Sequence, residues 1–235
     1  MRDSRNDPKP AVTRPATLDA PARPDGPSSP LVWVDSTDQL VVLGEPHVDV
    51  VVLRRHGYEA LAAYAAEVAA RLAVDRAVIA EPGRPGGLDG VDAFAEDLPA
   101  DDARDALVED VAYWVEVTAE LTGAPRVLAR LVRRAGLFHP EYFVAYASLR
   151  LVCTYAGAPP EWVDERDVDR AVVRTPGLGP AAAVRLGAVH HRAAALDVVL
   201  LKGNAWPGKE DRGVVFRHAP TETPRLVLLV EPMWA

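Results

Sequence analysis

The sequence is short of several residue types that mark particular protein classes. Its 235 residues include one cysteine and two methionines. The lone Cys153 cannot form an internal disulfide, which excludes a small secreted fold held together by disulfides. No apolar run approaches the roughly 20 residues that span a bilayer, so we expect no membrane partner. The first residues lack the apolar core of a signal peptide, which predicts a cytoplasmic location.

The chain also lacks an excess of basic residues. It has 26 Lys and Arg against 34 Asp and Glu, for a net charge of -8. This balance argues against a protein that wraps nucleic acid and favours a small-molecule substrate as the partner. Hydrophobic residues make up 49% of the chain, which is enough to build a core of ordinary size.

Proline is unevenly distributed along the chain. Seven of the 21 prolines lie in residues 1–30, among few large apolar side chains. Such a segment cannot bury enough surface to offset the entropy lost on ordering. We therefore predict a disordered, proline-rich tail over residues 1–30 and a single globular domain over residues 31–235.

The first half of that domain is predicted to contain its helices, over about residues 57–125. Apolar residues recur at three- and four-residue steps in two stretches, one over 58–72 and one that Asp101 or Asp102 can cap and Gly123 ends. Three short apolar stretches before them are predicted to be strands, at residues 31–34, 40–43 and 47–53.

From about residue 126 to 235 the pattern favours β-structure. Alternating or continuous apolar runs predict strands over residues 143–155, 196–202, 213–218 and 225–231. Helices followed by strands indicate an α+β fold, with the N-terminal helices packed on a mainly antiparallel sheet. Many short strands with turn-rich connections are compatible with a jelly roll, the double-stranded β-helix of cupin-like proteins.

The most suggestive chemical group is His139-Pro140-Glu141. Proline favours an extended residue before it, and side chains two apart on an extended segment point the same way. With His218, at the end of a predicted strand, His139 and Glu141 would form a two-His, one-carboxylate set suited to non-haem iron. Arg225 opens the next strand and could clamp a carboxylate as a catalytic and cofactor-binding residue.

A non-catalytic interpretation of these residues stays open. His139 could cap a loop, Glu141 could be solvated and His218 could lie at the surface. Trp206, in a tight turn, is either structural or lines a cofactor pocket. Cys153, on an apolar strand face, is predicted to be an inert core residue.

Three segments of the sequence resemble a known bacterial family. They are Leu149–Gly157, Glu161-Trp162 and Leu200–Gly208, and Phe138-His139 and Arg225-Leu226 fit as well. Together they resemble the family catalogued as domain of unknown function 1826, over roughly residues 45–231. The order of Asp197, His218 and Arg225 is also similar to the C-terminal half of iron- and 2-oxoglutarate-dependent oxygenases of the double-stranded β-helix type.

The sequence departs from the family pattern at two predicted metal ligands. The family usually has Phe-His-x-Asp, and here Glu141 replaces the aspartate. In the family's His-Arg-Ser-Pro stretch the histidine aligns with Phe216, and His218 takes the serine position. Residues 216 and 218 share a strand face, so His218 could reach the same space.

The resemblance implies a cupin-like oxygenase that acts on a small molecule, and a biosynthetic pathway is one setting for such a reaction. Fe(II) is the metal it suggests, and 2-oxoglutarate the co-substrate. Alternatives are a jelly-roll protein that binds zinc or a ligand without turnover, and a haem protein with His139 as axial ligand. An interaction role for residues 1–30 is a further alternative.

Overall fold

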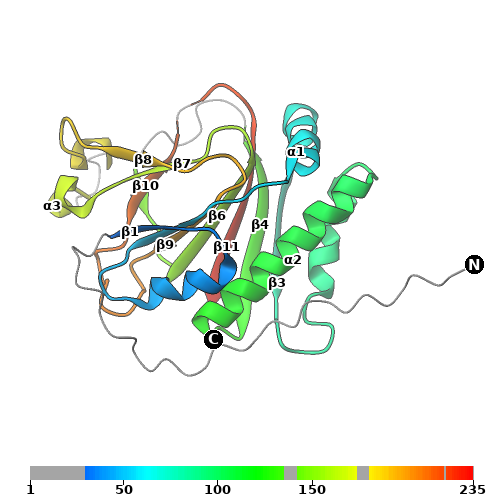
Figure 1. The fold of residues 1–235 in the computed structure, drawn as a ribbon, viewed down its shortest axis with the longest axis horizontal. Helices are drawn as coiled ribbons and strands as arrows, with labels where there is room; N and C mark the ends of the chain where they lie inside the picture. The colour runs from blue at the N-terminus through cyan, green and yellow to red at the C-terminus, as the bar shows by residue number, and fades with distance from the viewer. Residues whose placement is uncertain (1–29, 135–141, 174–179, 220, 235) are drawn as a thin grey trace, which may run out of the picture.

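The fold is built on two β-sheets that face each other (Figure 1). The computed structural model describes residues 30–134, 142–173, 180–219 and 221–234. Within them, seven strands form the larger sheet in the order β1-β2-β9-β6-β11-β4-β3, and four form the smaller in the order β5-β10-β7-β8. The larger sheet has β1 (Leu31–Val34), β2 (Val50–Leu53), β3 (Asp75–Ala80), β4 (Arg126–Arg134), β6 (Leu149–Ala156), β9 (Val198–Lys202) and β11 (Arg225–Met233). The smaller has β5 (Phe143–Val144), β7 (Pro160–Val163), β8 (His190–Arg192) and β10 (Val215–His218).

Most neighbouring strands of the described chain pair antiparallel, and β1 with β2 is a parallel pair. The longest ladder joins β11 to β4, from Arg225 opposite Arg134 to Met233 opposite Arg126. The other side of β11 pairs with β6. Because β11 is flanked on both sides, its first residue lies inside the sheet rather than at an exposed edge.

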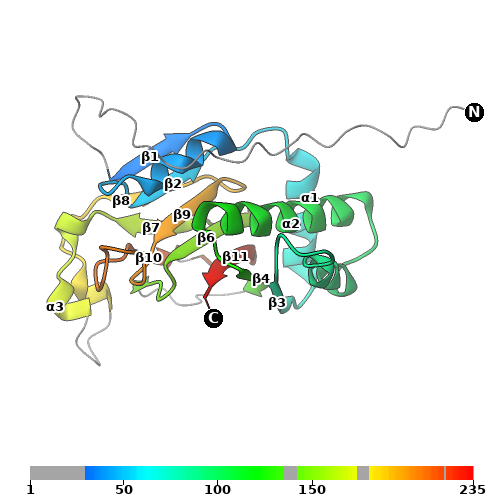
Figure 2. The same cartoon turned by 90° about the horizontal axis from the view of Figure 1, so that it is seen from below.

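Two helices cover the face of the larger sheet that points away from the smaller one (Figure 2). They are α1 (Glu59–Arg71) and α2 (Asp102–Thr122). Their apolar faces share one core with alternate residues of β6 and β11, such as Leu151 and Leu228. Among the described residues, no helix is both long and apolar enough to cross a bilayer. The sequence prediction of a mixed fold with helices and a sheet-rich core is therefore confirmed.

The ends of α2 follow the capping residues in the sequence. Asp101 accepts a hydrogen bond from the backbone N–H of Ala103 at 2.8 Å, which satisfies a donor that the first turn leaves free. At the other end Gly123 has a φ of 69°, the left-handed conformation that favours glycine. Both boundaries agree with the prediction.

The strand predicted over residues 40–43 is wrong. These residues belong to a 3-10 helix, η1 (Thr37–Gly44). The side chain of Gln39 accepts backbone N–H groups of Asp35 and Ser36, which starts the turn. Leu40 and Leu43 are buried three residues apart, a spacing that places both on one side of a 3-10 helix. A short apolar run fits this arrangement as well as it fits a strand.

The strand predicted over residues 143–155 is two strands in different sheets. The chain leaves the smaller sheet after β5 and enters the larger sheet at β6. Apolar residues occur on both sides of this change, so the hydrophobic pattern alone could not reveal it. Three further strands are not predicted by the sequence pattern: β3, which lies within the segment predicted to be helical, and β7 and β8.

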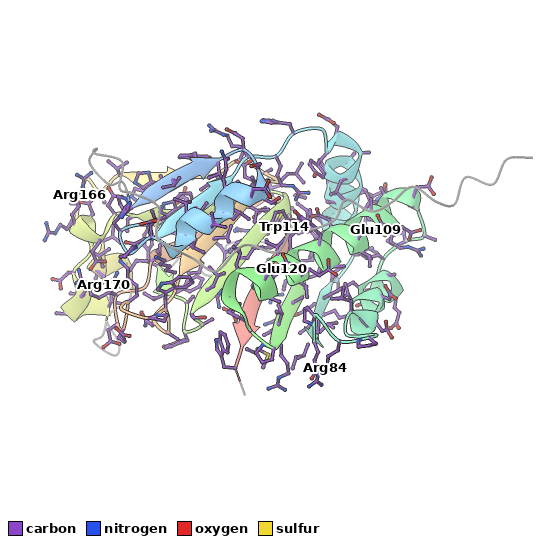
Figure 3. The ribbon with its side chains drawn as sticks, turned by 60° about the horizontal axis from the view of Figure 1, so that its bottom comes forward. Arg84, Glu109, Trp114, Glu120, Arg166 and Arg170 are labelled. Carbon is purple, nitrogen blue, oxygen red and sulfur yellow. The ribbon has the colours of Figure 1, made fainter. Side chains whose placement is uncertain are left out.

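Three further 3-10 helices and one short α-helix connect these elements. They are η2 (Asp89–Asp97), η3 (Glu165–Asp167), η4 (Pro180–Ala183) and α3 (Arg170–Val173). Figure 3 shows Arg166 and Arg170 around α3, at the far end of the molecule from the labelled residues of α2.

Candidate functional site

The candidate site lies between the two sheets, where β10 ends and β11 begins. Val152 of β6, Val227 of β11 and Phe216 of β10 are buried together in the core between the sheets. Side chains two apart on a strand point to the same face. Alternation therefore directs Thr154, Arg225 and His218 toward the same inter-sheet space.

Arg225 is a buried cation without an acidic partner among the described residues. It is 1% exposed, and its Nη2 donates to the carbonyl oxygen of Ala219 at 2.8 Å. Its Nε and Nη1 have no hydrogen-bond partner within the described part of the chain. Burial lowers the pKa of the guanidinium. A buried charge with free donors is costly unless an anion binds to it.

Gly157 allows this arginine to pack closely against the chain that follows β6. Its φ is 85°, and a Cβ atom there would lie 2.7 Å from the Cβ of Arg225 and 2.9 Å from the carbonyl oxygen of Pro224. Any larger residue would therefore displace the start of β11. The glycine fixes where the guanidinium is held.

His218 lies one residue before the carbonyl that Arg225 binds. It is half-buried at the end of β10, with its ring centroid 5.9 Å from that of Phe143. Phe216 is fully buried and packs against Phe143 at 4.2 Å between ring centroids. The position that aligns with the family histidine therefore belongs to the apolar core, and His218 lies nearer to Arg225.

The other predicted site residues are distributed differently. His139 and Glu141 lie outside the described residues. Asp197 accepts backbone N–H groups of Arg55 and Ala194, so it stabilises a turn. Among the described residues, no group of three or more His, Cys, Asp or Glu side chains could hold a metal ion.

Trp206 is not close to Arg225. Its ring lies 4.8 Å from the Nζ of Lys202, and Lys202 pairs with Leu149 at the start of β6. Arg225 lies beside the other end of β6, close to Gly157. A strand rises about 3.3 Å per residue, so the length of β6 separates the two residues by roughly 20 Å. The two predicted cofactor-binding residues thus lie at opposite ends of the sheet.

Lys202 is buried beside Trp206, and this position predicts a pH effect. Burial lowers the pKa of Lys202 to about 8, compared with about 10.4 in an unfolded chain. Between these values the unfolded chain binds more protons, so the free energy of unfolding rises with pH. In Lys202→Met we expect this rise to be smaller by up to about 2 kcal/mol. Denaturant unfolding of the wild type and of this variant at pH 7.5 and 10 measures the difference. Equal rises in the free energy of unfolding would contradict the prediction.

A buried ionic cluster that sequence analysis missed lies on the other face of β6. Arg55 donates from Nη2 and Nη1 to the two carboxylate oxygens of Asp110, at 2.6 and 3.1 Å. Asp110 also accepts from Tyr155 Oη at 2.6 Å and from Trp114 Nε1 at 3.2 Å. Trp114 lies on α2, as Figure 3 shows. One carboxylate thus connects α2 with the chain after β2 and with β6.

Electrostatics within this cluster favour the charged pair. Burial is the largest single effect and disfavours the charge of Arg55, but the attraction of Asp110 and the other polar groups around the guanidinium together outweigh it and raise the pKa of the arginine. Burial raises the pKa of Cys153 to about 12, so its thiol stays protonated. The predicted inert role of Cys153 agrees with this. One sequence signal could have indicated this cluster. The acidic residue Asp110 lies four residues before Trp114 on the apolar side of a predicted helix.

Two histidines of β8 are held by side chains of the smaller sheet and its loops. His190 Nδ1 hydrogen-bonds Tyr142 Oη, and His191 Nε2 lies 3.0 Å from an oxygen of Asp164. The ring of His191 stacks on Trp162. These contacts stabilise the smaller sheet.

Comparison with known proteins shows the family of this chain. The chain matches, over residues 34–231, the model of a family described as protein of unknown function (DUF1826). The chain belongs to this family. The resemblance predicted from the sequence is thus confirmed. No curated protein matches this DUF1826 member at a significant level.

Solved structures show which fold the family member has. A dioxygenase for auxin oxidation from rice is similar with a TM-score of 0.50 and 15% sequence identity, over 87% of this chain and 83% of that chain. Dioxygenase for auxin oxidation 1 from Arabidopsis thaliana, in a binary complex with 2-oxoglutarate, has a TM-score of 0.49 and 11% identity, over 88% and 93% of the two chains. At this identity, the similarity to the rice protein concerns the fold.

Proposed function

We propose that this protein is a non-haem Fe(II) oxygenase that acts on a small molecule and uses 2-oxoglutarate as its co-substrate. The observation that carries the proposal is the buried Arg225, whose Nε and Nη1 have no partner among the described residues. A carboxylate would neutralise its charge and accept its free N–H groups. The fold shared with the rice protein, described as a dioxygenase for auxin oxidation, supports the same assignment.

The proposed architecture is a jelly roll of eight strands, β4 to β11. Along the chain these strands alternate between the sheets except at β7 and β8, which follow each other in the smaller sheet. The larger sheet takes β4, β6, β9 and β11, and the smaller takes β5, β7, β8 and β10. Such a path encloses a space between two sheets, and a ligand enters it from one end. The proposed site is the end where β10 and β11 bring His218 and Arg225 together.

We propose His139, Glu141 and His218 as the metal ligands. Phe216 pairs with Phe143 in antiparallel register. His218 lies two residues beyond Phe216 on the same face of β10. Two histidines and one carboxylate suit Fe(II), which when bound supplies the chemistry of dioxygen activation at its open coordination positions.

The protein's own residues would bind and shield the co-substrate. Arg225 would hold the carboxylate by charge-assisted hydrogen bonds, and the Ala219 carbonyl would keep its side chain in place. Phe143 and Phe216 supply apolar walls deeper between the sheets. A site that excludes water strengthens each of these electrostatic contacts.

A test of the proposal combines metal content with co-substrate turnover. Full-length protein purified without oxygen is expected to bind Fe(II) with a stoichiometry near one. With ascorbate supplied as the reductant in place of a substrate, it is expected to convert 2-oxoglutarate to succinate and CO2 with consumption of O2. His218→Ala is expected to lose the iron and at least about 100-fold of the turnover, because a metal ligand is removed. His191→Ala is the matched control, since His191 contacts Asp164 and Trp162 instead.

Two outcomes would contradict the proposal. One is a wild-type protein that binds no Fe(II) under these conditions. The other is tight Zn(II) binding with no oxygen consumption after Fe(II) is supplied, which would favour a binding role without turnover.

A further inference from the structure

Thr154 is a second buried polar side chain that faces the same space as Arg225. The residue is 1% exposed, and its Oγ1 has no hydrogen-bond partner among the described residues. Buried hydroxyl groups normally have a partner, because an unsatisfied one costs free energy. An unpartnered hydroxyl between two sheets therefore points to a ligand.

Strand register places this threonine beside the arginine. Val227 pairs directly with Thr154, and Arg225 lies two residues before Val227 on the same face of β11. A diagonal neighbour on an adjacent strand has its Cβ about 7 Å away, within reach of a long side chain. The ladder shifts register between Leu226 and Val227, next to Arg225. Two adjacent strands thus direct unsatisfied donors into one buried space.

We propose that Thr154 and Arg225 together form an anion receptor, in which the threonine hydroxyl donates to the same carboxylate that the guanidinium neutralises. The identity of that carboxylate as 2-oxoglutarate rests on the proposed function. The receptor itself rests on the two unpartnered groups. Threonine at this position is then a specificity residue, because it contributes one directed hydrogen bond that valine cannot make.

The chemistry of the receptor limits its ligand. Arginine and threonine here offer N–H and O–H donors and one positive charge. A ligand must therefore bring a negative charge and at least two acceptor oxygens, as a carboxylate or a phosphate does. A carboxylate fits a buried site better than a doubly charged phosphate, since a single arginine neutralises only one charge.

Calorimetry on the full-length protein tests this inference. 2-Oxoglutarate, succinate and inorganic phosphate are titrated into the wild type, Thr154→Val, Thr154→Ser and Arg225→Met, without metal and with one equivalent of anaerobic Fe(II). We expect Thr154→Val to weaken binding of 2-oxoglutarate about 10- to 100-fold, the effect of losing a hydrogen bond to a charged group. Thr154→Ser keeps the hydroxyl and is expected to stay within about threefold of the wild type.

Thermal unfolding separates a ligand role from a structural one. Thr154→Val removes an unpartnered buried hydroxyl with little change of shape, so the ligand-free midpoint is expected to stay equal or rise. The increase in midpoint that 2-oxoglutarate gives the wild type is expected to shrink in this variant. A lower ligand-free midpoint with unchanged 2-oxoglutarate affinity would overturn the inference.

The remaining outcomes distinguish this inference from the proposed function. If Thr154→Val binds 2-oxoglutarate as tightly as the wild type while Arg225→Met does not bind it, the role of Thr154 is wrong and the proposed site stands. If the wild type binds succinate or phosphate through Thr154 but not 2-oxoglutarate, the receptor stands and the proposed co-substrate is wrong. A wild type that binds none of the three overturns both.

Discussion

Asp110→Asn is expected to lower the free energy of unfolding by about 3–5 kcal/mol, the range for removing one partner of a buried ion pair. The substitution keeps the size of the side chain but removes the charge that compensates Arg55. The side chains of Arg55 and Asp110 are only 4% and 11% exposed, so water cannot replace the lost carboxylate. Denaturant unfolding followed by far-UV circular dichroism measures the change.

Two control variants establish that burial causes the effect. Glu67→Gln removes the acid of an exposed pair with Arg71, whose side chains are 58% and 74% exposed, and we expect a loss below about 0.5 kcal/mol. Tyr155→Phe keeps the buried pair and removes one hydrogen bond to Asp110, with an expected loss of about 1.5–3 kcal/mol. Equal small losses in D110N and E67Q would show that the buried pair contributes no more than the exposed one.

Gly157→Ala is expected to cost about 2–5 kcal/mol of stability from two sources. A non-glycine residue in the left-handed region costs about 1–2 kcal/mol. The added Cβ would also lie 2.7 Å from the Cβ of Arg225 and 2.9 Å from the Pro224 carbonyl oxygen, and such overpacking costs about 1–3 kcal/mol. Because β11 must shift to relieve this contact, we also expect weaker binding of 2-oxoglutarate by Arg225.

Gly208 provides a matched control for the backbone contribution. Its φ of 80° is close to the 85° of Gly157, and an added Cβ there has nothing within 4 Å. Gly208→Ala is therefore expected to show only the backbone cost of about 1–2 kcal/mol, with 2-oxoglutarate affinity unchanged. Chemical denaturation and calorimetry of both variants measure these differences. If the two alanine variants lose the same stability and both bind 2-oxoglutarate normally, the contact at Gly157 does not position Arg225.

Some of the candidate site could be predicted from order along the chain. His218 and Arg225 are seven residues apart, at the end of one predicted strand and the start of the next, and the structure connects them through the Ala219 carbonyl. Trp206, the other predicted cofactor-binding residue, does not lie near His218 and Arg225. No local signal in the sequence shows that the last residue of β9, Lys202, pairs with the first residue of β6, far from Arg225.

Local patterns also fail where two arrangements share one periodicity. Leu40 and Leu43 fit a strand or a 3-10 helix equally well until Gln39 satisfies the backbone of Asp35 and Ser36. Residues 143–155 are mostly apolar on both sides of the point where the chain moves from one sheet to the other. In both cases hydrogen bonds between particular groups decide the outcome, and hydrophobic spacing does not report them.

The family resemblance, the mixed fold and the boundaries of α2 could be predicted from the amino-acid order alone. Capping residues and hydrophobic periodicity, which set the helix and its ends, act within a few residues of one another. Only the tertiary structure showed that Arg55 pairs with Asp110, and that Thr154 and Arg225 face one space with unsatisfied donors. Local patterns could not predict these pairs because the partners are far apart in sequence. Strand register and helix packing bring them together.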